Sequence, residues 1–171
     1  PRYAILDSEG NPVGEIKCDF KGDGSIFALD SSDNLYVVVQ DFQSESEMKN
    51  QLYIINPQGE TLKTMDLKTA VKGGTRMMGM GIVDLAVDSK GNAYLVKPEE
   101  NIEVMDKNGK SLKTIGSQGY QGICIDEEDN IIASNMNIQN GGNTLEKINA
   151  STGKNIWKQD LVSARNNIRI G

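Results

Sequence analysis

Apolar residues along this chain gather into short runs that are joined by acidic turns, and one arrangement occurs three times. In each copy an apolar run ends at Asp, an Asn follows four residues later, and a second apolar run begins there. Asp and Asn favour tight turns, whereas the β-branched and aromatic flanks favour strands. The pattern therefore predicts the same short β-hairpin three times, with its turns at Asp30–Asn34, Asp88–Asn92 and Asp126–Asn130.

A second kind of hairpin follows each of these, and one further copy opens the chain. Its turn starts with Asp or Asn and ends with Gly, which supplies a positive φ at little cost. An apolar residue lies four positions before each turn, and another lies three positions after each Gly. The four turns are Asp7–Gly10, Asn56–Gly59, Asp106–Gly109 and the longer Asn149–Gly153.

Two hairpins per repeat give four strands in about 40–50 residues, which is the period of a β-propeller blade. No segment between the strands shows a long helical period, so helical solenoids are excluded. We predict an all-β fold, a β-propeller in which about three and a half four-stranded antiparallel blades are visible. The expected single domain, 1–171, comprises the outer strands of one blade at 1–19, full blades at 24–66, 79–115 and 120–161, and the start of another at 162–171.

Two stretches resemble known propeller families. Residues 82–115, which run from Ile–Val–Asp–Leu–Ala–Val–Asp to Gly–Lys–Ser–Leu–Lys–Thr–Ile, resemble an NHL-type or SMP-30-like blade. Residues 145–157, with Thr–Gly three residues before the terminal Ile–Trp, resemble a blade of the PQQ-type, quinoprotein-like propellers. Together the resemblances extend over 1–161 and concern blade architecture. The PQQ-type resemblance implies that a tryptophan is docked between blades. Neither resemblance implies the activities or the cofactors of those families.

Three and a half blades are fewer than propellers normally use to close a ring. We therefore expect the chain to be a piece of a longer protein that supplies the remaining blades. The alternative is that a second copy pairs with the first to complete a ring of about seven blades.

Composition removes several functional classes. The chain carries 24 acidic and 18 basic residues, a net charge of −6, which disfavours nucleic acid as a partner. No apolar run is long enough to span a bilayer. The chain contains no histidine, so His general bases, Ser–His and Cys–His dyads and His-ligated zinc or haem iron are excluded. We expect no cofactor and no resident metal.

The connections expected at one end of the blades are long, whereas the turns at the other end are short. The long connections are 40–51, 67–80 and 134–143, and they hold five of the seven methionines. Loop length clustered on one face indicates a working surface, and Met suits adaptable apolar contacts. The alternatives are methionines that fill space beneath the loops and arginines that are merely solvated. The candidate ligand-binding residues are Asp41, Phe42, Met48, Arg76, Met77, Met78, Asp84, Asn135, Met136, Asn137 and Arg165.

Asp84 departs from the repeat, because the other two blades have Ile26 and Gly122 at this position. One interpretation is a carboxylate at the channel mouth that binds a cation or a polar ligand. The alternative is a carboxylate that caps backbone amides of the neighbouring loop.

The function that we predict is a non-catalytic, ligand- or protein-binding and scaffolding propeller, without catalytic residues, whose partner is a protein, peptide or glycan. The alternative is a fragment of a propeller enzyme such as an SMP-30-like metal-dependent lactonase or hydrolase, with Asp84 and the Asn-rich stretch contributing to its site. A third possibility is a purely structural module. The abundance of Lys, Asn and Ile suggests a bacterial source, and we expect an extracellular or cell-surface location.

Overall fold

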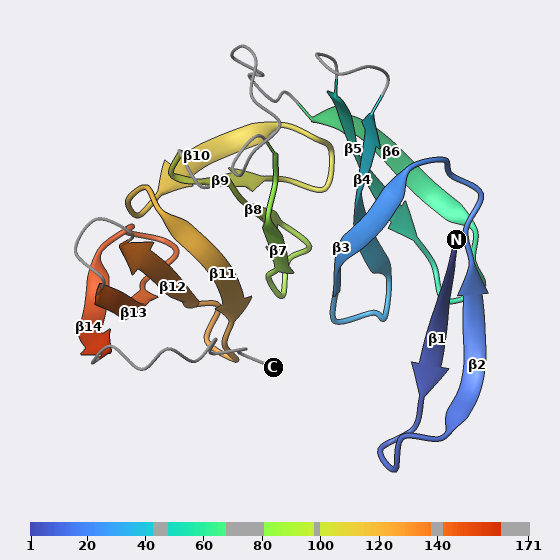
Figure 1. Cartoon of the computed structure of the whole chain (residues 1–171), viewed down its shortest axis with the longest axis horizontal. Helices are drawn as coiled ribbons and strands as arrows, with labels where there is room; N and C mark the ends of the chain where they lie inside the picture. Colours follow the sequence, from blue (N-terminus) through green and yellow to red (C-terminus); the bar gives the residue numbers. More distant parts are fainter. Residues whose placement is uncertain (43–47, 68–80, 98–99, 138–141, 162–171) are drawn as a thin grey trace. The chain divides into compact units, whose positions relative to one another are not determined.

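The computed structural model describes residues 1–42, 48–67, 81–97, 100–137 and 142–161, and every regular element within them is a β-strand (Figure 1). The all-β prediction is confirmed. No helix in this described part reaches the length and hydropathy of a membrane-spanning helix.

The strands form one two-stranded and three four-stranded sheets, each antiparallel with its strands in chain order. We name them sheets I to IV. Sheet I contains β1 (Arg2–Leu6) and β2 (Pro12–Lys17). Sheet II contains β3 (Asp23–Leu29), β4 (Leu35–Phe42), β5 (Met48–Ile55) and β6 (Thr61–Leu67). Sheet III contains β7 (Asp84–Val87), β8 (Ala93–Val96), β9 (Ile102–Met105) and β10 (Ser111–Ile115). Sheet IV contains β11 (Tyr120–Ile125), β12 (Ile131–Asn137), β13 (Gly142–Ile148) and β14 (Asn155–Leu161).

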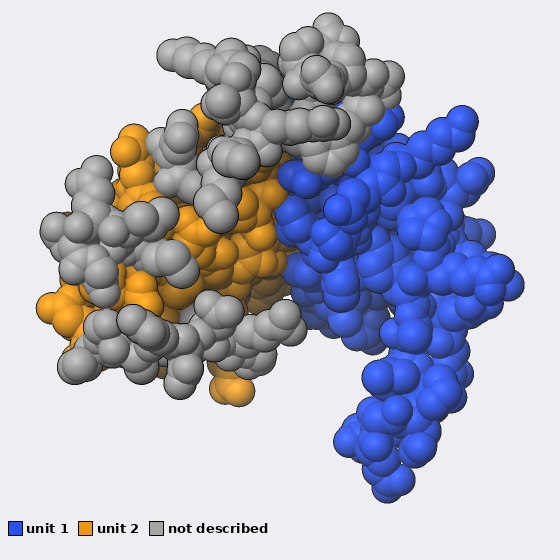
Figure 2. Space-filling view, in the orientation of Figure 1, with its two compact units in different colours: residues 1–74 blue, residues 75–171 orange. Residues whose placement is uncertain are grey.

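Contacts divide the chain into two compact units, Pro1–Gly74 and Thr75–Gly171, which Figure 2 shows in blue and orange. Unit 1 holds sheets I and II, and unit 2 holds sheets III and IV. A single domain over 1–171 stays a prediction.

Six hairpin turns among the described residues use one side-chain device, which the turn at Asp88 illustrates; in the longer turn at Asn149, the side chain accepts from Thr152 instead. Its Oδ1 accepts the backbone N–H groups of Lys90 (2.9 Å) and Asn92 (2.8 Å), while Oδ2 accepts the Asn92 amide (2.7 Å). Satisfying these N–H groups locally fixes the chain reversal. The first residue of the turn accepts the same pair of backbone bonds at Asp7, Asp30, Asn56, Asp106 and Asp126.

The core of unit 2 lies between sheets III and IV. Sheet III contributes residues from all four of its strands. The face of sheet IV that lies against sheet III contributes the rest of the core. Because both surfaces are apolar, the two sheets bury each other face to face. The members are Ala86, Tyr94, Val96, Ile102, Val104 and Ile115 from sheet III, and Tyr120, Ile123, Ile131, Ala133, Ile148 and Ala150 from sheet IV and its turn.

The core of unit 1 repeats this arrangement with the smaller sheet I. Ile16 of β2 is buried against Phe20 and the apolar residues of sheet II, and Tyr3 packs beside it. The Phe20 ring lies 5.1 Å from that of Tyr53. Sheet I therefore covers one face of sheet II, just as sheet III covers one face of sheet IV. The sheet II members are Leu35, Val37, Val39 and Ile55.

The last strand of sheet III carries two apolar residues that differ in exposure. In sheet III, Leu112 is 48 % exposed, whereas Ile115, three residues later, is 3 % exposed and belongs to the shared core. Ile16 in sheet I is buried in the same way by the sheet that follows. In sheet IV the corresponding residue is Gln159, which is exposed, and Trp157 is 40 % exposed.

Candidate functional site

The hairpins β4–β5 and β12–β13 extend beyond the first strand of their own sheets. In sheet II the pairing of β3 with β4 stops at Gln40, but β4 and β5 continue to pair through Phe42. In sheet IV the pairing of β11 with β12 stops at Asn135, but β12 and β13 continue through Asn137. We call these additional pairs the hairpin tips; they are Asp41–Lys49 and Phe42–Met48 in sheet II, and Met136–Asn143 and Asn137–Gly142 in sheet IV.

Two connections that the sequence predicts as long loops are partly strand, because they include the tips. Within 40–51 and 134–143, the described residues on both sides are strand, because cross-strand backbone pairing continues past the first strand of each sheet. Sheet III has no such tip among the described residues, since its second and third strands are only four residues long.

Five predicted ligand-binding residues lie on the tips, and a sixth lies directly beside one. Asn135 adjoins the sheet IV tip and donates its side-chain N–H to the Gln118 carbonyl (2.8 Å). Arg76, Met77, Met78 and Arg165 lie outside the described residues. The five on the tips are Asp41, Phe42, Met48, Met136 and Asn137.

The sheet II tip carries charge of both signs. Lys49 Nζ lies 3.5 Å from Asp66 Oδ1 on β6, and Gln51 donates to that same oxygen at 2.7 Å. Both partners of the ion pair are more than half exposed, so the pair orients side chains and stabilises little.

Asp84 links the first strands of sheets III and IV. Its Oδ2 accepts the backbone N–H of Ile123 on β11 (2.7 Å), and its Oδ1 accepts the N–H of Leu85 (2.9 Å). Burial raises the pKa of Asp84, and the two N–H groups partly oppose that rise. Both oxygens therefore hold strand amides, and ligand binding by Asp84 stays a prediction.

Sequence reasoning missed a buried carboxylate on β13. Glu146 is 3 % exposed and accepts hydrogen bonds from the Tyr120 hydroxyl (2.8 Å) and the Asn155 amide (3.2 Å), while Lys158 lies 2.7 Å away. Burial would raise the pKa of Glu146, but Lys158 and the other donors outweigh it, and the pKa is lowered. Every bond joins elements of one sheet, so the cluster is structural. Because β13 mixes polar and apolar residues, no local pattern in the sequence marks Glu146 as buried.

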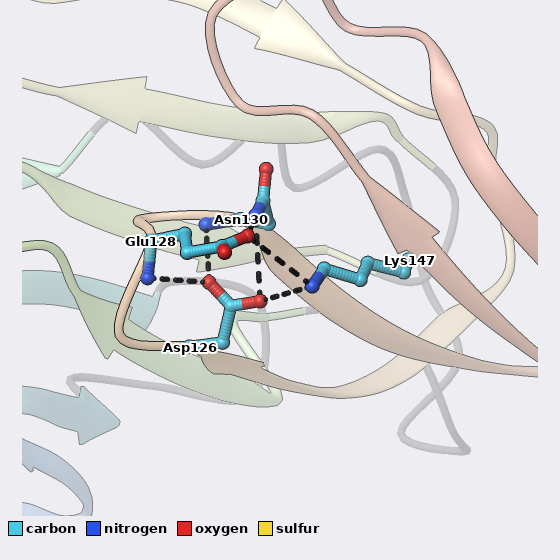
Figure 3. Close-up of polar contacts among 4 residues, drawn as sticks. All are labelled: Asp126, Glu128, Asn130 and Lys147. Atoms are coloured by element: carbon cyan, nitrogen blue, oxygen red, sulfur yellow. Dashed lines mark hydrogen bonds and ion pairs between the residues drawn. The ribbon is translucent and has the colours of Figure 1, made fainter.

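A second polar cluster surrounds the turn between β11 and β12 (Figure 3). The Lys147 ammonium lies 2.7 Å from Asp126 Oδ2 and 3.6 Å from Glu128, which accepts an amide bond from Asn130 (3.0 Å). Desolvation alone would raise the pKa of Asp126, but Lys147 and the turn amides lower it to about 2. The cluster stabilises the turn and leaves the carboxylate ionised.

Lys97, at the end of β8, forms a third charged group that sequence reasoning missed. Its side chain is 11 % exposed, and its Nζ lies 2.7 Å from Glu103 and 3.4 Å from Glu100. Burial would lower the pKa of Lys97, but the two carboxylates raise it. Across the described residues, no three His, Cys, Asp or Glu side chains come together in a way that could hold a metal ion.

Comparison with known proteins shows the fold. No family model and no curated protein sequence matches the chain. A protein of unknown function from Bacteroides caccae has a similar structure, with a TM-score of 0.64 at 11 % identity over 91 % of this chain and 53 % of that one. Kuenenia stuttgartiensis hydrazine synthase is similar, with a TM-score of 0.62 at 15 % identity over 92 % of this chain and 42 % of that one.

A third similar structure is named as a propeller. The Dos1 propeller aligns with a TM-score of 0.57 at 12 % identity over 94 % of this chain and 42 % of that one. The chain thus spans about half the length, or less, of these three proteins. At such low identities the likeness concerns the fold alone, and that fold is β-propeller-like.

Proposed function

We propose that this β-propeller-like chain is a non-catalytic recognition module that binds a protein, peptide or glycan through its hairpin tips. The observation that carries the proposal is the position of the candidate residues, because five of them lie on the two hairpins that extend past the rest of their sheets. Backbone pairing through these positions lowers the entropy cost of ordering the chain on binding, compared with an unpaired loop.

The chemistry of the tips fits adaptable recognition. In the backbone register Phe42 is the partner of Met48 on the sheet II tip, and Met136 and Asn137 occupy consecutive positions on the sheet IV tip. Aromatic and thioether groups supply contact area, and amides and charges such as Asp41 add directional bonds. This combination suits peptides and glycans.

The finer assignments are part of the same proposal. Blades of the NHL or SMP-30-like and PQQ-like kinds, a bacterial origin, an extracellular or surface location, and further blades supplied by a longer chain or a second copy all agree with a surface recognition module. The lactonase alternative rests on Asp84, whose two oxygens already accept backbone N–H groups.

Selection from a displayed random-peptide library, together with a glycan array, tests this proposal. Ligands obtained on the wild-type chain are titrated against Phe42→Ala and Asn137→Ala, with Lys107→Ala in an opposite-end turn as the control. We expect a ligand of the sheet II tip to lose about tenfold or more in affinity with Phe42→Ala, and a ligand of the sheet IV tip to lose as much with Asn137→Ala, while the control binds as wild type. Equal binding to all variants, or no ligand from either selection, would overturn the proposal.

A further inference from the structure

In unit 1, one edge of the strand β1 is unpaired among the described residues. β1 precedes its turn as β5, β9 and β13 precede theirs, and each of those strands is paired on both sides. Among the described residues, only β2 pairs with β1. Cys18 N–H donates to the Pro1 carbonyl at the start of this ladder, so strand alternation directs the backbone groups of Arg2 and Ala4 toward the other edge.

Beside this edge, β3 presents large apolar side chains to solvent. Phe27 and Leu29 are 52 % and 55 % exposed. Their counterparts in sheet IV, counted from the turn Asp, are Ile123 and Ile125, which pack into the core shared with sheet III.

In that core, the hairpin β7–β8 contributes Ala86, Tyr94 and Val96 opposite sheet IV. The same surface on sheet II is partly formed, because the Tyr3 ring meets the Phe27 ring edge-on at 5.2 Å. Sheet I thus supplies the outer part of the interface seen in unit 2, while the part made there by β7–β8 has no counterpart among the described residues of unit 1.

The two units also differ in the contacts of one turn carboxylate. In sheet IV, Asp129 has φ 60° and accepts both the backbone N–H (2.8 Å) and the hydroxyl (2.6 Å) of Ser89, the residue after the turn Asp of sheet III. Asp33 occupies the same turn position in sheet II, has φ 61° and is exposed. The described residues place no serine or other partner at its carboxylate.

We propose that the open edge of β1, the apolar pair Phe27 and Leu29, and Asp33 form one acceptor surface for a two-stranded β-hairpin. The occupant has the chemistry of β7–β8, namely two apolar strands joined by an Asp–Ser–x–Gly–Asn turn. Its first strand covers Phe27 and Leu29, its second pairs antiparallel with β1, and its serine donates two hydrogen bonds to Asp33. The surface shares no residue with the hairpin tips, so its test is independent of ligand binding there; the inference rests on the proposed addition of further blades and specifies the hairpin that would be added.

A synthetic peptide with the sequence of residues 82–97, which includes Ser89, serves as the probe. NMR titration of the labelled 171-residue chain should show slower amide exchange at Arg2 and Ala4 and shifts at Phe27 and Asp33. Phe27→Ala and Asp33→Gly should each weaken peptide binding about tenfold, and a Ser89→Gly peptide should bind the wild-type chain equally weakly. Gly is the matched choice at residue 33, because Gly91 occupies that turn position in sheet III with φ 78°.

A covalent graft keeps the inference testable if the free peptide does not fold alone. Residues 82–99 are placed directly before Pro1, which preserves the natural spacing because Tyr3 corresponds to Ile102. We expect exchange at Arg2 and Ala4 to slow about tenfold or more relative to a graft of scrambled sequence. Equal protection by both grafts, or no protection by peptide and graft alike, would overturn the inference.

Self-association is the competing outcome. Protection of Arg2 and Ala4 that rises with the concentration of the chain alone, without peptide or graft, would show that a second copy occupies the surface. That result would also overturn the assignment of a β7–β8-like hairpin as the occupant.

Discussion

At the scale of single residues, the carboxylates of this protein hold strands and turns in place. Asp88 and its equivalents cap backbone N–H groups of their own turns, whereas Asp84 and Asp129 reach from one sheet to the next. The sequence predicts the first group, because a turn is local. It predicts the second group poorly, since the partner of Asp129 lies 40 residues away.

The Asp129 contact leads to a residue-scale prediction. Asp129→Gly keeps the positive φ but removes two charge-assisted hydrogen bonds to Ser89, so unfolding free energy should fall by about 1–2 kcal/mol. Asp33→Gly is the matched control, because it makes the same change where no such partner is described, and it should alter stability little. Urea unfolding of both variants measures the difference; equal losses would contradict the assignment of the Asp129 bonds.

The Asp126 cluster leads to a pH prediction. Because the pKa of Asp126 is lowered to about 2, its ionised form stabilises the fold above its usual pKa, near 3.8, and this contribution is lost as the pH falls toward 2. Lys147→Ala removes the ammonium, so the pKa of Asp126 should rise and acid destabilisation should begin at higher pH. NMR titration of the carboxyl carbon measures the shift, with Lys107→Ala as the control; an unchanged pKa in Lys147→Ala would show that the turn amides alone set it.

At the scale of elements, the last strand of sheet III has one apolar residue that faces solvent and another that lies in the core. Apolar residues at both positions of β10 look alike in the sequence, but only Ile115 meets the next sheet, whereas Leu112 faces solvent. Strand alternation cannot separate them, because residues three apart lie on opposite faces and both are apolar. Contact with the neighbouring sheet IV buries Ile115, whereas Leu112 has no such contact.

This contrast gives a prediction for β10. Ile115→Ala leaves a cavity between sheets III and IV and should cost about 2–4 kcal/mol of unfolding free energy. Leu112→Ala, in the same strand and about half exposed, should cost well under half of that. Chemical denaturation with fluorescence of Trp157 follows both, and similar losses in the two variants would be inconsistent with the described packing.

At the scale of the whole molecule, the chain is a β-propeller-like array in two compact units. Unit 2 contains a continuous core to which both of its sheets contribute. Sheets III and IV depend on each other for the burial of the faces that form this cluster, as in other repeat architectures. Sheets III and IV together are thus the smallest part of unit 2 that buries this shared core.

The unit 2 core leads to a prediction about folding. A polypeptide of residues 81–161 should unfold cooperatively on its own, because sheets III and IV bury the same apolar cluster. A polypeptide of residues 81–116, which contains sheet III alone, should remain unfolded, since half of its core would face water. Circular dichroism during thermal unfolding distinguishes the two, and a structureless 81–161 would show that the units depend on each other.

The sequence by itself determined the strands, the turns and the repeat, because these follow from local rules: alternation of apolar residues, Asx capping, and glycine at positive φ. It also placed Asp41, Phe42 and Asn137 at one end of the hairpins, since strand direction follows from the order of the turns. Only the tertiary structure revealed the pairing of Asp84 with Ile123, the burial of Glu146 and Lys97, and the exposure of Phe27. These depend on which sheet covers which face, and contacts between residues far apart in the chain leave no local pattern in the sequence.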